Sequence, residues 1–155
     1  MVIDTGAAEG DVRGVLATLP DPEIPVLSVV DLGIVHRVVV REDRIDVVIL
    51  PTFVGCPALD VIQATITERL EARFGREVRV ETTFEVPWTS DRITPAGRTA
   101  LRDAGIAPPA DPSDMRCPMC ESPNVVMDSA FGPTQCRSLF YCRSCRQPFE
   151  ALKSV

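Results

Sequence analysis

The sequence predicts an α+β domain, with a small three-stranded sheet and packed helices, followed by a four-cysteine module. Three observations lead to this fold class. Stretches with helical periodicity and stretches rich in β-branched residues follow one another in the order α-β-β-α-β-α over residues 11–105. A proline-rich segment comes next, and two Cys-x-x-Cys pairs follow it.

The first part of the chain contains one predicted helix and a predicted β-hairpin. Residues 11–19 place apolar side chains at the spacing of one face of a short amphipathic helix. Residues 35–40 and 44–50 are rich in β-branched side chains, and the three polar residues between them predict a hairpin. Since residues 47–50 are all apolar, we expect the second strand to be covered on both faces, at the centre of the sheet.

A longer helix, a third strand and a shorter helix follow. The helix is predicted over residues 58–74, and Gly75 is typical of a helix C-terminus. Four of its apolar residues share one stripe: Leu59, Ile62, Ile66 and Leu70. Alternating apolar residues predict a strand within residues 77–86. Thr94 and Pro95, a capping residue followed by proline in the first turn, predict a helix that ends at Gly105.

These elements suggest three segments. Residues 1–106 are predicted to form the α+β domain and residues 115–155 the four-cysteine domain. Between them, residues 107–114 contain three prolines and no large apolar side chain, which predicts a stiff linker.

Composition narrows the class of protein. Of the 155 residues, 45% are apolar and 25% charged, as is ordinary for a folded domain. The net charge of −6 argues against a nucleic-acid partner, which needs a basic face. No apolar run approaches the ~20 residues that span a bilayer, and the first ten residues lack the features of a secretory signal. We therefore expect a cytoplasmic protein with no membrane partner.

In the cytoplasm, cysteines serve as metal ligands or reactive thiols more often than as disulfides. Two residues between paired cysteines allow one tight turn to aim both sulfurs at a single point. The sequence thus predicts a metal site with four thiolate ligands, and zinc is the expected ion. The predicted ligands are Cys117, Cys120, Cys142 and Cys145.

The metal should also supply stability, because a segment of roughly 40 residues buries too little apolar area to fold alone. Three alternatives stay open at this point. The site could hold iron, as in rubredoxin, or the cysteines could be unpaired or joined as disulfides. Cys136 could replace one ligand or be a partly buried spare thiol.

Cys56 is the second candidate for chemistry. It lies between a predicted buried strand and the start of the predicted helix 58–74. The positive end of a helix dipole favours the thiolate, so Cys56 could be a nucleophile or a labile metal ligand, although a small buried apolar role is the alternative. A nucleophile needs a base, and the single histidine, His36, is more typical of an edge strand.

Four motifs in the first part of the chain resemble the small domain of SufT-like iron–sulfur assembly factors. They are residues 21–25 (Asp-Pro-Glu-Ile-Pro), 29–35 (Val-Val-Asp-Leu-Gly-Ile-Val), 51–57 (Pro-Thr-x-x-Gly-Cys-Pro) and 86–89 (Val-Pro-Trp-Thr). With the four-cysteine part included, residues 11–153 resemble the D-type subunits of the bacterial phenylacetyl-CoA epoxidases, the ring-epoxidising complexes of phenylacetate catabolism.

The resemblance implies an accessory or maturation subunit of an oxygenase complex and not an enzyme. It implies a cofactor-handling site in which the loop of Cys56 and Thr52 faces the turn of Asp21 and Glu23, with iron or an iron–sulfur cluster held transiently at Cys56. The implied partners are the diiron oxygenase and the flavin and iron–sulfur reductase of the complex, or iron–sulfur carriers, and related domains often form homodimers. A purely structural docking subunit and a rubredoxin-like electron carrier are the alternatives.

The chain departs from a typical zinc ribbon at two positions. Glycine commonly follows each Cys-x-x-Cys pair in a ribbon, whereas Glu121 and Arg146 stand there in this chain. The departure leaves the predicted ligands unchanged, but it makes the two turns less ideal.

Overall fold

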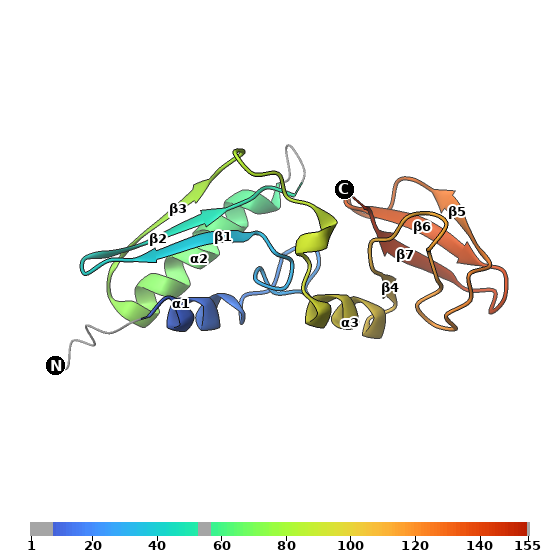
Figure 1. Ribbon diagram of the computed structural model, residues 1–155, viewed down its shortest axis with the longest axis horizontal. Helices are drawn as coiled ribbons and strands as arrows, with labels where there is room; N and C mark the ends of the chain where they lie inside the picture. Colours follow the sequence, from blue (N-terminus) through green and yellow to red (C-terminus); the bar gives the residue numbers. More distant parts are fainter. Residues whose placement is uncertain (1–7, 53–56, 155) are drawn as a thin grey trace. The chain divides into compact units, whose positions relative to one another are not determined.

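The computed structural model describes residues 8–52 and 57–154. The chain divides into two compact units, Met1–Trp88 and Thr89–Val155 (Figure 1). The predicted α+β fold class and the ribbon that follows it are both confirmed. None of the described helices combines the length and the apolar character that a bilayer-spanning segment needs.

The first unit is a three-stranded sheet with two helices along one face (Figure 1). Its elements are α1 (Glu9–Leu16), β1 (Val35–Val40), β2 (Arg44–Ile49), α2 (Ala58–Phe74) and β3 (Glu77–Thr82). The strand order is β1-β2-β3, with β1 antiparallel and β3 parallel to β2. As expected from its apolar end, β2 is the central strand, and its last three residues are buried.

Local capping explains where the helices begin and end. The Asp11 carboxylate accepts a hydrogen bond from the Ala8 N–H (2.9 Å), so α1 starts earlier than the predicted residue 11. The helix also ends earlier than predicted, at Leu16. For α2 the predicted bounds are confirmed. Gly75 ends this helix in the left-handed conformation (φ +63°), where a Cβ atom would be strained, and its N–H donates to the Glu71 carbonyl (2.9 Å).

The second unit is a four-stranded sheet preceded by two short helical segments. Its elements are η1 (Ser90–Arg92), α3 (Pro95–Asp103), β4 (Ile106–Ala107), β5 (Val125–Ser129), β6 (Arg137–Cys142) and β7 (Pro148–Leu152). The order is β4-β7-β6-β5, in which only β4 and β7 are parallel. The Thr94 side chain caps α3 by accepting from the Gly97 N–H (3.0 Å), as predicted.

The core of this unit is small and includes two of the predicted ligands. It consists of Ala107, Met115, Cys117, Phe140, Cys142, Phe149 and Ala151. The rings of Phe140 and Phe149 stack with their centroids 5.6 Å apart. Outside this cluster the unit buries only a few other large apolar side chains, Ile93, Leu101 and Leu152, so the apolar area alone gives it little stability.

The two units divide between Trp88 and Thr89, earlier than the predicted domain end at residue 106. The predicted linker, residues 107–114, falls inside the second unit. Ala107 pairs with Ala151 of β7 and is only 1% exposed, and the Arg98 guanidinium donates to the Pro109 carbonyl (3.2 Å). A small side chain anchors the segment here, so the absence of large apolar residues did not reveal its packing.

Candidate metal centre and the loop after the central strand

The two Cys-x-x-Cys pairs occupy two tight turns, one before β5 and one directly after β6. Backbone hydrogen bonds close the turns: Cys117 N–H donates to the Ser122 carbonyl (3.0 Å), and Cys142 N–H donates to the Gln147 carbonyl (2.9 Å). The hydroxyls of Ser122 and Ser144 lie 2.7 Å apart and join the turns to each other. The turns are thereby fixed against one another by groups other than the cysteines.

This arrangement brings the four cysteine sulfurs into one group, with all ligand atoms within 4.8 Å of one another. The sulfurs of Cys117 and Cys145 are 3.7 Å apart, and those of Cys120 and Cys142 are 3.6 Å apart. A tetrahedral ion with metal–sulfur bonds of ~2.3 Å places its ligands ~3.8 Å apart, whereas a disulfide needs ~2.05 Å. The spacing therefore fits a four-coordinate metal ion, and the described cysteines are not joined as disulfides.

The surroundings of the thiols act on their ionisation in opposite directions. The backbone N–H groups of Cys145 and Ser144 donate to the Cys142 sulfur and lower the pKa of this thiol to about 7, although burial opposes the shift. Burial, together with the neighbouring sulfurs of Cys142 and Cys117, raises the pKa of Cys145 to about 12. Four thiolates packed this closely repel one another unless a cation lies among them. A bound metal ion would supply that cation.

Cys136 lies outside this group. It is 7% exposed, and its sulfur is 3.0 Å from the Thr134 hydroxyl. Of the two interpretations left open by the sequence, the structure favours the buried spare thiol.

The residues that replace the expected glycines adopt the conformation that glycine would favour. Glu121 (φ +62°) and Arg146 (φ +59°) are the only described residues other than glycine with positive φ. The Glu121 N–H donates to the Cys117 carbonyl (2.9 Å), so this conformation is part of the turn that aims the sulfurs. A side chain in the left-handed region costs about 1–2 kcal/mol, and the chain carries this cost at both turns.

We therefore expect Glu121→Gly and Arg146→Gly each to strengthen metal retention. The strain relieved in the folded turn outweighs the free-energy cost of the greater freedom of glycine in the unfolded chain by about 0.5–1 kcal/mol. This difference corresponds to a factor of roughly two to five in metal affinity. Competition with a chromophoric chelator measures this factor. Glu121→Ala is the matched control, because it removes the side chain but keeps the Cβ atom. A gain in the alanine variant equal to that in the glycine variant would contradict the explanation.

The second candidate site is organised around the end of β2. The Leu50 N–H donates to the Ile34 carbonyl (2.8 Å), and the Thr83 N–H donates to the Ile49 carbonyl (3.1 Å). The Trp88 indole N–H donates to the Leu32 carbonyl (2.9 Å) in the interior. Residues 32–34 are thus joined both to Leu50, directly after β2, and to Trp88.

Trp88 is the residue whose role the sequence interpretation missed. It appeared only as part of a motif, yet its ring is 4% exposed and its hydrogen bond joins segments that are 56 positions apart. The sequence did offer a signal for this role, because a single tryptophan in a chain with few aromatic residues is a candidate for a buried anchor.

The turn of Asp21 and Glu23 is tied to the same region through the backbone. Asp21 N–H donates to the Leu27 carbonyl (2.8 Å), and Val29 N–H donates to the Leu19 carbonyl (2.9 Å). The buried Asp21 carboxylate accepts from the N–H groups of Glu23 (2.9 Å) and Ile24 (2.8 Å). Asp21 therefore shapes this turn, and Glu23 is half-buried beside it.

Of the loop residues predicted to handle a cofactor, Thr52 is described and half-buried, while Cys56 lies outside the described residues. The loop leads into α2, whose N-terminal residue Pro57 provides no side-chain cap. This helix is 17 residues long, and its first N–H groups have no partner within the helix itself. His36, the only histidine, lies on the edge strand β1, as expected.

Comparison with known proteins also separates the chain into two parts. The family model for an iron–sulfur cluster assembly protein matches residues 9–82, and the model for the PaaD zinc beta ribbon domain matches residues 102–153. Two solved structures resemble the first part. The domain of unknown function DUF59 of Bacillus anthracis is 25% identical with a TM-score of 0.56, and the match covers 60% of this chain and 90% of that one. A conserved hypothetical protein of Thermotoga maritima is 28% identical with a TM-score of 0.53, and the match covers 63% of this chain and 96% of that one.

Two curated proteins are similar in sequence. A Porphyromonas gingivalis protein named Fe-S protein maturation auxiliary factor is 36% identical over 88 residues, 56% of this chain and 83% of the relative. An Escherichia coli (strain K12) protein, provisionally named as the D-type subunit of 1,2-phenylacetyl-CoA epoxidase, is 37% identical over 152 residues, which are 94% of this chain and 92% of the relative. Since this similarity runs through both units, the chain belongs to the family of D-type phenylacetyl-CoA epoxidase subunits, with an iron–sulfur assembly-type domain followed by a zinc ribbon.

Proposed function

We propose that this protein is an accessory subunit that helps to mature or deliver an iron–sulfur or diiron cofactor for an epoxidase of the phenylacetyl-CoA type, with Cys56 as the thiol that handles the cargo. The observation that carries the proposal is that residues 32–34 are hydrogen-bonded to Trp88 and to Leu50, directly before the loop that leads into α2. The kinship with an iron–sulfur maturation factor supports it.

The contacts around this loop suit a thiol that must bind and release a metal. Leu50, directly before the loop, is buried, whereas Thr52 reaches the surface in part. The positive end of the α2 dipole favours a negative charge close to its first turn, and a thiolate there is both nucleophilic and a soft ligand for iron. One thiolate holds a metal far less tightly than four, as delivery to a client requires.

We assign the four-cysteine centre a structural zinc ion. Four thiolates occupy all positions of a tetrahedral ion, so no site is left for a substrate. Metal analysis of protein purified without oxygen tests the assignment. We expect zinc near one equivalent per chain and a colourless protein. A red protein that bleaches on reduction would instead indicate a rubredoxin-like electron carrier.

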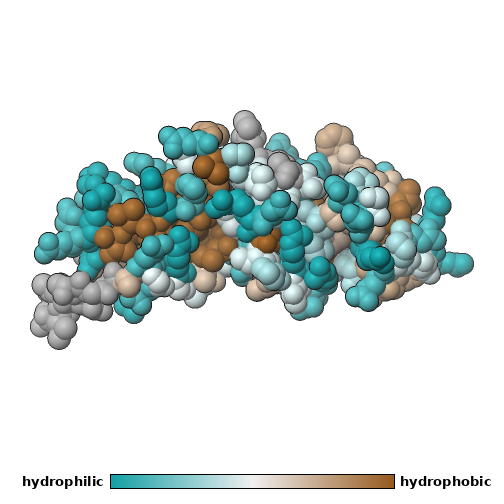
Figure 2. Space-filling model, in the orientation of Figure 1, coloured by the Kyte–Doolittle hydropathy of each residue, from teal (hydrophilic) through white to brown (hydrophobic). Residues whose placement is uncertain are grey.

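A specific observation favours a second function, docking, for the ribbon. Apolar side chains reach the surface of the second unit, and in Figure 2 apolar atoms are visible on the side of β5 and β6. The most exposed are Met119, Met127 and Phe131. Methionines adapt to differently shaped partners, so this unit could hold the protein on the other subunits of the complex.

The substitution Cys56→Ser separates delivery from docking. In co-expression with the oxygenase and reductase subunits, we expect the variant to co-purify with them but to leave them short of iron. Loss of a group that only supports a metal ligand lowers metal affinity roughly 10–100-fold, so loss of the ligand itself should lower it at least as much. Iron per client chain is the measurement, and Cys136→Ser, at a buried thiol outside the metal group, is the matched control. Full iron occupancy with Cys56→Ser would leave docking as the function.

A further inference from the structure

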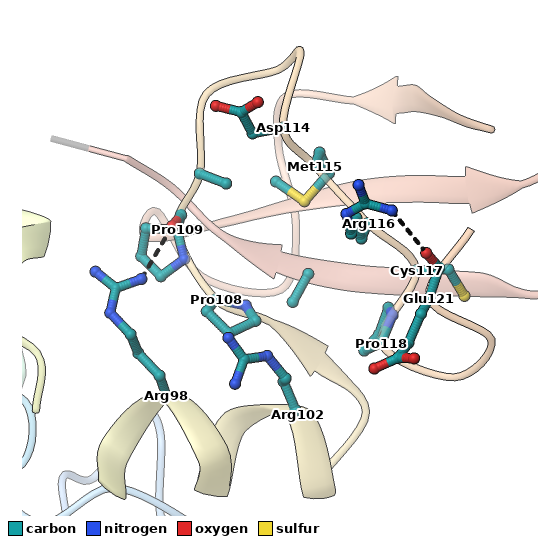
Figure 3. A pocket seen from close by; sticks show the side chains of 12 residues that line it. Arg98, Arg102, Pro108, Pro109, Asp114, Met115, Arg116, Cys117, Pro118 and Glu121 are labelled. Atoms are coloured by element: carbon teal, nitrogen blue, oxygen red, sulfur yellow. Dashed lines mark hydrogen bonds between the residues drawn. The ribbon is translucent and has the colours of Figure 1, made fainter. Parts of the chain in front are cut away.

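A pocket of about 280 Å³ lies in the second unit, between α3 and the first cysteine turn (Figure 3). Three arginines line it, Arg98 and Arg102 from α3 and Arg116 from the segment before the turn. Prolines 108, 109 and 118 form much of its apolar wall. Cys117 borders the pocket, but the other three cysteines of the sulfur group do not line it.

Two of these arginines are held in place without losing their charge. Arg98 donates to the carbonyls of Pro109 (3.2 Å) and Ser90 (2.9 Å), and Arg116 donates to the carbonyl of Glu121 (3.3 Å) (Figure 3). These acceptors are neutral, so the hydrogen bonds fix the guanidinium groups but do not neutralise them. The charges are thus set in position before any ligand arrives.

Arg102 is different, because its guanidinium has no hydrogen bond or ion pair among the described residues. Its side chain extends from α3 towards Pro108, between Arg98 and Pro118 (Figure 3). Several arginines of the first unit are paired, by contrast: Arg41 and Arg44 contact Asp46, and Arg79 contacts Glu77. An arginine fork left open beside two fixed positive charges is suited to an anion.

The acidic residues of the pocket indicate the charge of that anion. Asp114 and Glu121 also line it, yet neither forms an ion pair with the three arginines in the described part of the chain. Three guanidinium groups and two carboxylates leave one net positive charge. This balance suits a monoanion better than a dianionic phosphate, which the two carboxylates would repel.

We propose that this pocket binds a carboxylate group on a short aliphatic stem, with Arg102 as its direct ligand. The planar guanidinium can donate two parallel hydrogen bonds to the two carboxylate oxygens. Arg98 and Arg116 supply the fixed positive field, and the prolines contact the stem. The carboxylate belongs to an acidic side chain of a partner protein or to a free organic acid, which share this chemistry.

The test is a titration of the full-length, metal-loaded protein followed by the NMR signals of arginine Nε–H groups and backbone amides. Acetate and the peptide acetyl-Gly-Glu-Gly-amide are the probes, at constant ionic strength. We expect saturable shifts of the Arg102 Nε–H signal and of amides in residues 107–121. Arg102→Gln should weaken binding about tenfold or more, because charge-assisted hydrogen bonds are lost. Arg143→Gln, an equal charge change at an exposed arginine outside the pocket, should leave it unchanged.

The outcomes also separate the two sources of the carboxylate. Tighter binding of the peptide than of acetate would support the site and assign it to a protein side chain, and equal binding would support it for a free acid. The same shifts with acetyl-Gly-Gln-Gly-amide, a matched peptide without the carboxylate, or with chloride, would overturn the proposal. Tighter binding of inorganic phosphate, or equal losses in Arg102→Gln and Arg143→Gln, would overturn it as well.

Discussion

Removal of the metal from the four-cysteine centre is expected to unfold the second unit while the first unit keeps its fold. A core cluster of the second unit has seven buried residues, and two of them, Cys117 and Cys142, are ligands. Zinc binding to small four-ligand modules supplies about 10–16 kcal/mol, as much as the whole stability of an ordinary domain. The first unit has a core of its own around β2, so it does not depend on the metal.

Hydrogen exchange measured with and without a strong chelator, under reducing conditions, checks this expectation. Amides of β6 and β7 should lose their protection, while those of β2 should retain it. Cys142→Ser should reproduce the effect without a chelator, and Cys136→Ser, at a thiol outside the sulfur group, should not. If β6 and β7 stayed protected after the metal had been removed, the metal would not be the main source of stability in this unit.

The substitution Trp88→Ala is expected to destabilise the first unit by about 3–5 kcal/mol, the cost of deleting a large buried aromatic side chain. Its ring is buried, and its indole N–H is bonded to the Leu32 carbonyl 2.9 Å away. The substitution leaves a cavity and also an unsatisfied buried carbonyl. Trp88→Phe keeps most of the apolar ring and loses only the donor, so we expect a smaller cost of about 1–3 kcal/mol.

The free energy of unfolding of each variant is measured in urea. Amide protection of β2 serves as the readout, because it reports on the first unit. Phe84→Ala is the control, because Phe84 is an aromatic residue of the same unit that is 74% exposed. Its loss should change stability by no more than about 0.5 kcal/mol. Equal effects of Trp88→Ala and Phe84→Ala would show that burial of the indole and its hydrogen bond to Leu32 do not stabilise the first unit.

Features that depend on neighbours in the chain were predictable from the sequence. The helix 58–74 with its glycine stop, the hairpin of β1 and β2, and the Thr94 cap all rest on local periodicity or on one side chain that bonds its own turn. The spacing of the cysteine pairs belongs to the same class, because each pair spans a single turn. The order of the elements followed from these local patterns.

Only the tertiary structure decided where the units divide and which residues meet. Ala107 is buried because β4 pairs with β7, and Trp88 ends the first unit because its indole reaches Leu32. The left-handed conformation of Glu121 and Arg146 is imposed by the turns around the sulfurs, against the preference of both side chains. Local sequence determined α1 to α3, β1 to β3 and the four thiols of this protein. Contacts between distant residues, which no short window of sequence encodes, determined the strands of the second sheet, the boundary of the units and the assembly of the sites.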